Sequence, residues 1–300
     1  MTGPGAPRRL LVTPPFSLAI TCGPVAWARG RWSNVDWIDN ALVWVGWEGG
    51  RAVWRIARQV GEAELVITGS ASAAGDESWA RGVLGVGERA PVFADPVIGV
   101  LAERMPGLRP QSAGSLFDGL VSSIVGQSIS VAAAATVGRR LAAQWGKPIE
   151  LAGRLFWPAP RADQLATAEA ESLRACGLPW RRAEALVVVG RAFQRGEAPT
   201  DAEARADPAE AIARLRALPL VGPWTAASAL LWGVGAADAF PTGDVALLRA
   251  TRRAYARPDM GMRDLDALAE GWRPGRGWAA RWLWTDLLGI AESPAGLGAP

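Results

Sequence analysis

The residues between Leu218 and Asp244 are the ones whose types and spacing could do chemistry. They read Leu-Pro-Leu-Val-Gly-Pro-Trp-Thr-Ala, continue through an apolar stretch, and end in Asp-Ala-Phe-Pro-Thr-Gly-Asp. Gly222 and Pro223 suit a tight turn that runs directly into a helix start, where backbone N–H groups point outward and attract an anion. The segment therefore predicts a phosphate-binding turn between two helices, followed by a loop that ends in a carboxylate.

Start and stop signals define the helices that position this segment. Asp207 begins a helix over residues 208–217, and Pro223 begins a second one that runs to Trp232 and stops at the following glycine. Asp244 could also serve as the N-cap of a third helix over residues 245–255, a role that carboxylates often have. The structural and the chemical interpretation of Asp244 can hold together.

Further helices are predicted upstream of the hairpin. Ser115 caps a helix that has Asp118 in its first turn and breaks at residues 126–130. A second helix covers residues 131–145. Two more are predicted, over residues 163–175 and 180–195, each followed by a glycine.

Strand signals are concentrated near the N-terminus. Residues 41–47, 52–56 and 63–68 are rich in β-branched and aromatic residues and are separated by turn formers. The sequence therefore predicts an α+β protein in which a small antiparallel β-rich N-terminal domain, residues 1–110, precedes an all-helical domain, residues 111–300. The helical part could form two subdomains with a cleft between them.

Composition excludes several kinds of chemistry. The 300 residues contain no histidine and a single lysine, Lys147, so histidine general bases and histidine-ligated zinc are impossible. Two cysteines cannot form a disulfide framework or a four-thiolate iron–sulfur site. Residues 217–237 carry no charge, but prolines and glycines interrupt them as in a soluble hairpin. With no apolar signal core at the N-terminus, we expect a cytoplasmic protein without membrane contact.

The order of these motifs resembles the helix-hairpin-helix DNA glycosylases, and among them the DNA-3-methyladenine glycosylase II family. The resemblance rests on segments spread over most of the chain, namely residues 117–132, 177–186, 219–240 and 272–284. It implies base excision repair of double-stranded DNA that contains damaged bases, carried out by a monomer associated with the nucleoid.

The resemblance implies that Asp244, twenty positions after Trp224, is the catalytic carboxylate. Cleavage of a base–sugar bond builds positive charge on the deoxyribose, and a fixed negative charge stabilises that cation or orients the attacking water. Asp238 is the second acidic residue of the loop, and we interpret it as a structural turn residue.

Sixteen tryptophans against one tyrosine fit a pocket for an electron-poor base, because an indole face attracts a cationic ring. Trp224 and Trp284 match the base-pocket positions of the family, although each could equally be an ordinary core residue. Ser228 and Ala246 are small at two further pocket positions and predict a roomier pocket.

Two departures concern DNA binding. Gln127 matches the helix break of the family, but the next position, where close relatives have a larger apolar wedge residue, is Ser128, and Ile129 is the alternative wedge. The hairpin has Leu220 where the first glycine is usual. Because leucine disfavours positive φ, we expect a slightly altered turn or greater reliance of the phosphate on the amides near Gly222 and Thr225.

Family members that also cut the strand use a lysine two positions after the second hairpin glycine, which here is Trp224. The sequence thus predicts a monofunctional DNA-3-methyladenine glycosylase that hydrolyses the N-glycosidic bond of alkylated purines without a lyase step. No metal or organic cofactor is expected, and a monovalent cation at the hairpin is allowed by the resemblance. The alternatives are a glycosylase of the same fold for deaminated or oxidised bases, and a non-catalytic helix-hairpin-helix DNA-binding protein.

Overall fold

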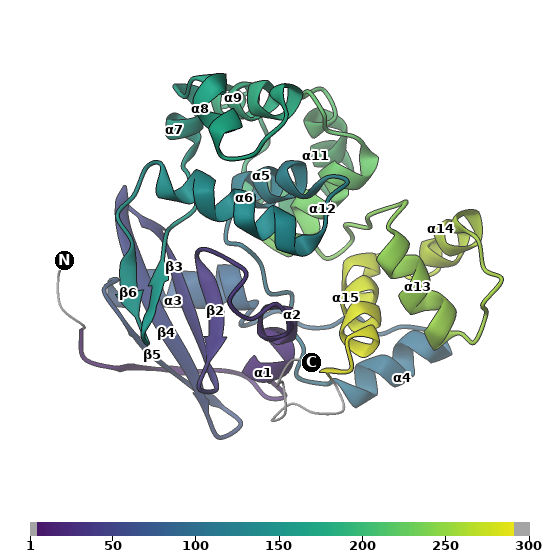
Figure 1. Cartoon of the computed structure of the whole chain (residues 1–300). Coiled ribbons are helices and arrows are strands. Elements are labelled where there is room, and N and C mark those ends of the chain that lie inside the picture. The colour runs from purple at the N-terminus through teal and green to yellow at the C-terminus, as the bar shows by residue number, and fades with distance from the viewer. Residues whose placement is uncertain (1–4, 291–300) are drawn as a thin grey trace.

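A five-stranded antiparallel sheet forms the N-terminal part of the chain in the computed structural model, which describes residues 5–290 (Figure 1). Its strands lie in the order β1–β5–β4–β3–β2. Their bounds are β1 (Arg8–Leu11), β2 (Val35–Ile38), β3 (Ala41–Glu48), β4 (Arg51–Val60) and β5 (Glu64–Gly69). The three strands predicted from sequence correspond to β3, β4 and β5.

Both faces of strand β3 are buried, which explains its continuous apolar sequence. Leu42 and Trp44 point to a cluster on one face, formed with the short helices α1 (Leu18–Thr21) and α2 (Gly23–Trp27) and with α3 (Ala73–Leu84). Val43 and Val45 point to the other face, where the hairpin of β6 (Ile149–Leu151) and β7 (Arg154–Phe156) covers them. Successive side chains of a strand alternate in this way between the faces of a sheet.

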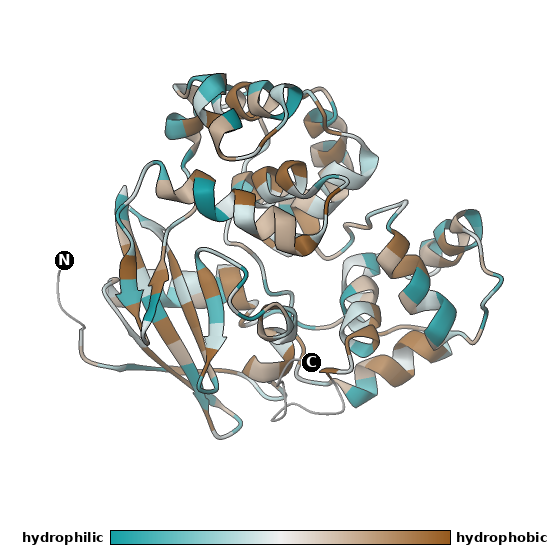
Figure 2. Ribbon diagram, viewed as in Figure 1, coloured by the Kyte–Doolittle hydropathy of each residue, from teal (hydrophilic) through white to brown (hydrophobic). Residues whose placement is uncertain are grey.

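The remaining helices form the larger part of the molecule (Figure 1). The helices α4 (Pro96–Arg104), α13 (Val245–Ala254), α14 (Met262–Glu270) and α15 (Arg276–Leu287) lie together beside the sheet. The others are α5 (Leu116–Gly126), α6 (Val131–Ala143), α7 (Ala162–Ala166), α8 (Ala170–Ala175), α9 (Trp180–Gln194), α10 (Asp201–Ala206), α11 (Pro208–Leu215) and α12 (Pro223–Val234). Figure 2 shows hydrophobic residues concentrated on the sheet and on the central helices α5 and α12.

The fold class is confirmed, but several elements differ from the sequence prediction: helices α1 to α4 and α14 and strands β1 and β2 were not predicted, and three further differences lie in the second part of the chain. Residues 163–175 form two helices, α7 and α8, because the chain leaves helical geometry at residues 167–169. The short helix α10 had no counterpart in the prediction, and the β6–β7 hairpin interrupts the otherwise helical second part. Three-residue strands are too short to show a periodic pattern.

The boundary at residue 110 stays a prediction. Elements on each side of it pack against the other side, since α4 belongs to the large helical core and the β6–β7 hairpin covers the sheet. Within residues 5–290, no helix is long and apolar enough to cross a membrane.

Helices α5 and α12 pack at very short range because glycines face each other. A Cβ atom on Gly119 would lie 2.5 Å from the Cα of Gly233, and a Cβ atom on Gly233 would lie 2.7 Å from the carbonyl oxygen of Ser115. At the other end of the pair, the Gln127 side chain after α5 reaches Thr225 in the first turn of α12. The two helices are therefore antiparallel, and the end of α5 adjoins the start of α12.

The carbonyls at the end of α12 all have partners from distant segments. Ala113 N and Gly114 N donate to the carbonyls of Trp232 and Gly233, at 2.7 and 3.2 Å. Two arginines donate to the other two carbonyls of the last turn: Arg281 to Leu231, and Arg205 to Val234 at 3.0 Å. These bonds satisfy acceptors that a helix leaves unpaired at its C-terminal end.

We predict that Asp118 makes folding stability fall as the pH rises. Burial, together with the nearby charge of Asp201, raises the pKa of Asp118 to about 7, although a hydrogen bond with Ser115 acts in the opposite direction. A raised folded-state pKa gives a contribution that is fully present below the unfolded pKa of about 4 and is lost by about pH 7. In urea unfolding at pH 8, Asp118→Asn should therefore be about 1–2 kcal/mol more stable than the wild type.

The control for this prediction is Asp207→Asn, an exposed aspartate that caps α11. It should leave the difference in stability between pH 5 and pH 8 unchanged. An equal gain from Asp118→Asn at both pH values would contradict the prediction.

Candidate functional site

Asp244 and Trp224 lie together although twenty residues separate them in the sequence. The indole Nε1 of Trp224, in the first turn of α12, donates to Oδ2 of Asp244 at 3.0 Å. The other carboxylate oxygen, Oδ1, accepts from the backbone N–H of Leu247 at 2.7 Å, which makes Asp244 the N-cap of α13. Asp244 is half-buried, so its carboxylate is oriented by two donors and still reachable from solvent.

The turn between α11 and α12 keeps a left-handed residue without a glycine. Leu220 has φ of 62°, so a leucine here adopts the backbone conformation that glycine adopts most readily, and the expected reliance of a phosphate on the amides near Gly222 and Thr225 stays a prediction. Leucine holds this geometry at a cost of about 1 kcal/mol. Leu220 therefore adopts, in this turn, a backbone conformation that leucine disfavours.

The start of α12 presents free backbone amides. Gly222 is the N-cap of this helix, is exposed, and supplies no side-chain cap. The N–H groups of Trp224 and Thr225 are therefore available to an anion at the positive end of the helix dipole. The carbonyls of Leu218 and Leu220 accept hydrogen bonds from Val221 N and Gln127 Nε2, and the hairpin cation stays a prediction.

Gln127 ties the turn after α5 to the hairpin. Its Nε2 donates to the carbonyl of Leu220 at 2.8 Å and to Oγ1 of Thr225 at 2.9 Å. Its own carbonyl accepts from a guanidinium nitrogen of Arg182, at the start of α9. Three segments that are far apart in the sequence therefore meet at one side chain and its peptide group.

The exposed apex of this turn contains Ser128 and Ile129. Ser128 has φ of 56°, and the side chain that follows it, Ile129, is 38% exposed. An exposed β-branched residue on a turn held by Gln127 fits the alternative wedge better than the small serine does.

Trp284, the second tryptophan predicted for a base pocket, has a partner that the sequence analysis missed. The Trp284 ring lies 5.2 Å from the ring of Trp232, at an interplanar angle of 36°. The guanidinium of Arg281 stands over the other indole of the pair, 4.6 Å from the Trp232 centroid. Of the two small residues predicted to line the pocket, Ser228 is buried on α12 and Ala246 is exposed at the start of α13; the roomier pocket stays a prediction.

Asp238 is fully engaged within the loop that leads to Asp244. Its two carboxylate oxygens accept from Arg273 Nη1 at 2.6 Å and from Arg276 Nε and Nη2 at 3.0 and 2.8 Å. The backbone N–H of Arg276 also donates to it at 3.2 Å. These contacts agree with its interpretation as a structural residue, whereas Asp244 keeps a solvent-accessible edge.

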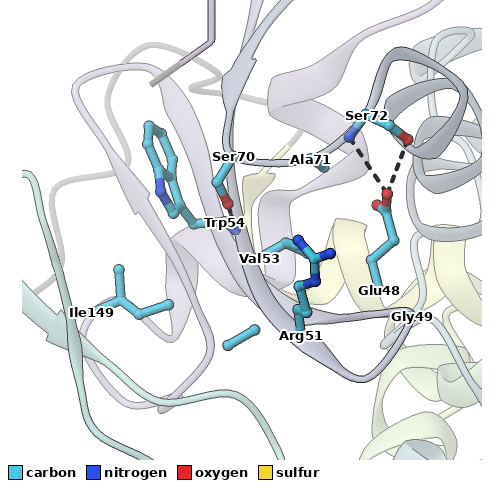
Figure 3. A pocket seen from close by; sticks show the side chains of 10 residues that line it. Glu48, Gly49, Arg51, Val53, Trp54, Ser70, Ala71, Ser72 and Ile149 are labelled. Atoms are coloured by element: carbon cyan, nitrogen blue, oxygen red, sulfur yellow. Dashed lines mark hydrogen bonds between the residues drawn. The ribbon is translucent and has the colours of Figure 1, made fainter. Parts of the chain in front are cut away.

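One hollow on the molecule is lined by residues other than those of this site. It has a volume of about 370 Å³ and is lined by residues of the β3–β4 hairpin, by the start of α3 and by Ile149 (Figure 3). Glu48 accepts hydrogen bonds there from the N–H and Oγ of Ser72, at 3.4 and 3.0 Å. A second hollow, of about 420 Å³, lies between the N-terminal segment and residues 86–90. Asp244 lines neither of these two hollows.

Three residues near the candidate site escaped sequence reasoning. Trp232 lies eight positions after Trp224 on α12, about 80° further around the helix axis, so periodicity alone does not place the two side chains on one face. Arg281 stands among tryptophans and alanines, a composition that does not reveal whether its side chain points inward. Arg182 makes its contact through a backbone carbonyl, for which no sequence pattern exists.

Comparison with known proteins gives a family match over residues 121–274, described as "HhH-GPD superfamily base excision DNA repair protein". Over 195 residues, 65% of this chain, it is 31% identical to DNA-3-methyladenine glycosylase 2 of Escherichia coli strain K12. Over 197 residues it is 24% identical to the DNA-3-methyladenine glycosylase of Bacillus subtilis strain 168. The matched segments span 66% and 64% of these two relatives, so about a third of each lies outside the match.

Solved structures agree on the fold. The 3-methyladenine DNA-glycosylase from Archaeoglobus fulgidus gives a TM-score of 0.74 with 21% identity, over 92% of this chain and 97% of that one. The 8-oxoguanine glycosylase/lyase of Clostridium acetobutylicum, in complex with double-stranded DNA, gives 0.69 with 18% identity, over 90% and 91%. At these identities the likeness concerns the fold alone.

We predict that the helix-capping role of Asp244 can be separated from its charge. Asparagine caps helices about as well as aspartate, so Asp244→Asn should change the free energy of unfolding by less than about 0.5 kcal/mol. Asp244→Ala removes the acceptor for Leu247 N and should cost about 1 kcal/mol. Urea denaturation of both variants at pH 7.5 measures the difference, and equal losses would contradict it.

Proposed function

The chain belongs to the HhH-GPD superfamily of base excision DNA repair proteins, and on this premise we propose that it is a monofunctional DNA glycosylase. It would hydrolyse the N-glycosidic bond of alkylated purines, of the 3-methyladenine type, in double-stranded DNA. We propose further that it acts as a monomer, in the cytoplasm and on nucleoid DNA. The names of the curated relatives support the substrate class.

The observation that carries the proposal is the carboxylate of Asp244 beside the indole of Trp224. Rupture of the bond from C1′ to the base nitrogen leaves the electron pair on the departing base and positive charge on the sugar. A water oxygen then bonds to C1′ and releases a proton. A fixed carboxylate that is 3.0 Å from the indole and open on one side can stabilise the cation and accept that proton.

The strand would be held on either side of this carboxylate. The free amides at the start of α12 would bind a phosphate, and Gln127 fixes the turn that carries Ser128 and Ile129 against that hairpin. A nucleotide must leave the duplex for its C1′ to reach Asp244, and this costs a few kcal/mol. An exposed Ile129 at the apex is suited to fill the space that the nucleotide leaves.

Monofunctional chemistry follows from the absence of an amine at the hairpin. A lyase step requires a lysine that forms a Schiff base with the sugar. The only lysine of the chain, Lys147, is exposed between α6 and β6, on the side of the sheet. The enzyme would therefore leave an intact strand with an abasic site.

The proposal is tested by base release from duplexes that each contain one modified purine. The wild type should release a methylated purine, and Asp244→Asn should lower the single-turnover rate by about 10²–10³-fold, because it removes the charge that stabilises the sugar cation. Duplex affinity of the variant should stay within about threefold, since the carboxylate is not a phosphate ligand. Both are measured with labelled oligonucleotides.

The other outcomes identify the alternatives. Release of hypoxanthine, uracil or an oxidised purine alone would indicate a glycosylase for deaminated or oxidised bases. Tight duplex binding without release of any base would indicate a non-catalytic DNA-binding protein. Strand cleavage and a covalent adduct trapped by borohydride would refute the monofunctional assignment.

We predict that Gln127→Ala weakens DNA binding by roughly 5- to 10-fold. The change removes two hydrogen bonds between the α5–α6 turn and the hairpin, each contributing about 1 kcal/mol to their mutual placement. The matched control is Gln144→Ala, because the Gln144 amide similarly bridges two segments, donating to the carbonyl of Ser172 and to Cys176 Sγ. Fluorescence anisotropy should show a higher Kd for Gln127→Ala only. Equal effects of the two variants would contradict the role of Gln127 in DNA binding.

A further inference from the structure

Arg281 is a buried cation without an anionic partner. Arg281 is 5% exposed and lies on the inner face of α15. Among the described residues no carboxylate lies within ion-pair distance of it. Its Nε has no hydrogen-bond partner, and burial lowers its pKa to about 9. A desolvated charge of this kind is unfavourable unless another property of the molecule depends on it.

The contacts of Arg281 lead to Trp284, which the family resemblance assigns to the base pocket. One guanidinium nitrogen donates to the carbonyl of Leu231, and the guanidinium stacks on Trp232 at 4.6 Å. Trp232 in turn packs against Trp284, with 5.2 Å between the ring centroids. No more than about 10 Å therefore separates the charge from the Trp284 ring.

Capping the carbonyls at the end of α12 does not by itself require a buried arginine at position 281. Arg205 also donates a hydrogen bond to a carbonyl of the last turn of α12, that of Val234. It does so from an exposed position on α10, where its charge stays hydrated. Capping of α12 can thus be achieved without burying a cation. What distinguishes Arg281 from Arg205 is its contact with the tryptophan pair.

Resting on the proposed function, we propose that Arg281 sets the charge selectivity of the base pocket: its buried positive charge, acting through Trp232 and Trp284, lowers the preference for cationic alkylated purines over neutral modified purines. Arg281 is a specificity-determining residue that does not itself need to touch the base.

The direction of the effect follows from electrostatics. Trp224, Trp284 and the carboxylate of Asp244 all attract a cationic base, by cation–π forces and by charge. Arg281 already occupies one indole of the pair, and like charges repel across a medium of low effective dielectric. At about 10 Å and an effective dielectric constant of about 20, this repulsion corresponds to roughly a 5- to 20-fold disadvantage for a cationic base. A neutral base is unaffected to first order.

The test compares single-turnover release of N7-methylguanine, which is cationic, with release of hypoxanthine, which is neutral, from otherwise identical duplexes. Arg281→Gln keeps a donor for the Leu231 carbonyl and Arg281→Met keeps the apolar volume, and both remove the charge. Each should raise the ratio of the two rates about 5- to 20-fold over the wild type, through a faster reaction of the cationic base. Arg205→Gln, the control at the same helix end, should leave the ratio unchanged.

Each outcome has a distinct meaning. An unchanged ratio in a folded Arg281 variant, or an equal rise in Arg205→Gln, would overturn the inference and reduce Arg281 to a helix cap. If hypoxanthine is not released, the rate on N7-methylguanine alone decides, and it must rise in the Arg281 variants only. If the wild type releases neither base, the proposed function itself fails.

Discussion

The contact between Gly119 and Gly233 is the constraint on which the candidate site depends. Any side chain at either position would overlap backbone atoms of the opposite helix, so only glycine lets α5 and α12 approach this closely. Because the helices are antiparallel, their close approach carries the end of α5 to the start of α12. Gln127 can then reach Leu220 and Thr225, and the two turns become one surface.

The position of Asp244 beside Trp224 depends on the C-terminal end of α12, where the loop to Asp244 begins. After Gly235, which has φ of 69°, the chain runs along α15, where the N–H of Gly277 donates to the carbonyl of Ala237 at 2.8 Å. A Cβ atom on Gly277 would lie 2.6 Å from the carbonyl oxygen of Ala236, so the loop can lie this close to the helix only at a glycine. The arginines around Asp238 then fix the middle of the loop. Rigid anchoring on both sides explains how a carboxylate on a loop acquires a defined position.

Local signals in the sequence were sufficient for most elements and for part of the site. Asp244 as the cap of α13, Ser115 as the cap of α5 and Pro223 at the start of α12 follow from capping rules that involve only neighbouring residues. The Trp224–Asp244 hydrogen bond could be anticipated only from the resemblance to a family, because twenty residues of loop and helix separate the two. The preference of leucine against positive φ did not decide the turn: Leu220 has φ of 62°, and its carbonyl accepts a hydrogen bond from Gln127. Arg281 could not be placed at all, because its burial depends on how α15 packs against α12.

The carboxylate of Asp244 and the guanidinium of Arg281 would act on the proposed reaction at different distances. This difference explains how both charges can be present near the tryptophans. Coulomb energy falls with distance, so a carboxylate in contact with the sugar outweighs a guanidinium about 10 Å from the Trp284 ring roughly threefold at equal dielectric. Arg281 can therefore disfavour a cationic base without cancelling the stabilisation of the sugar cation by Asp244. The same distance dependence explains why the cation must be buried: at the surface, like Arg205, its field would be screened within about 10 Å. Arg281 is held by a helix carbonyl and an indole face, and within residues 5–290 no carboxylate forms an ion pair with it, so under the proposal its charge would act on the base pocket without neutralisation.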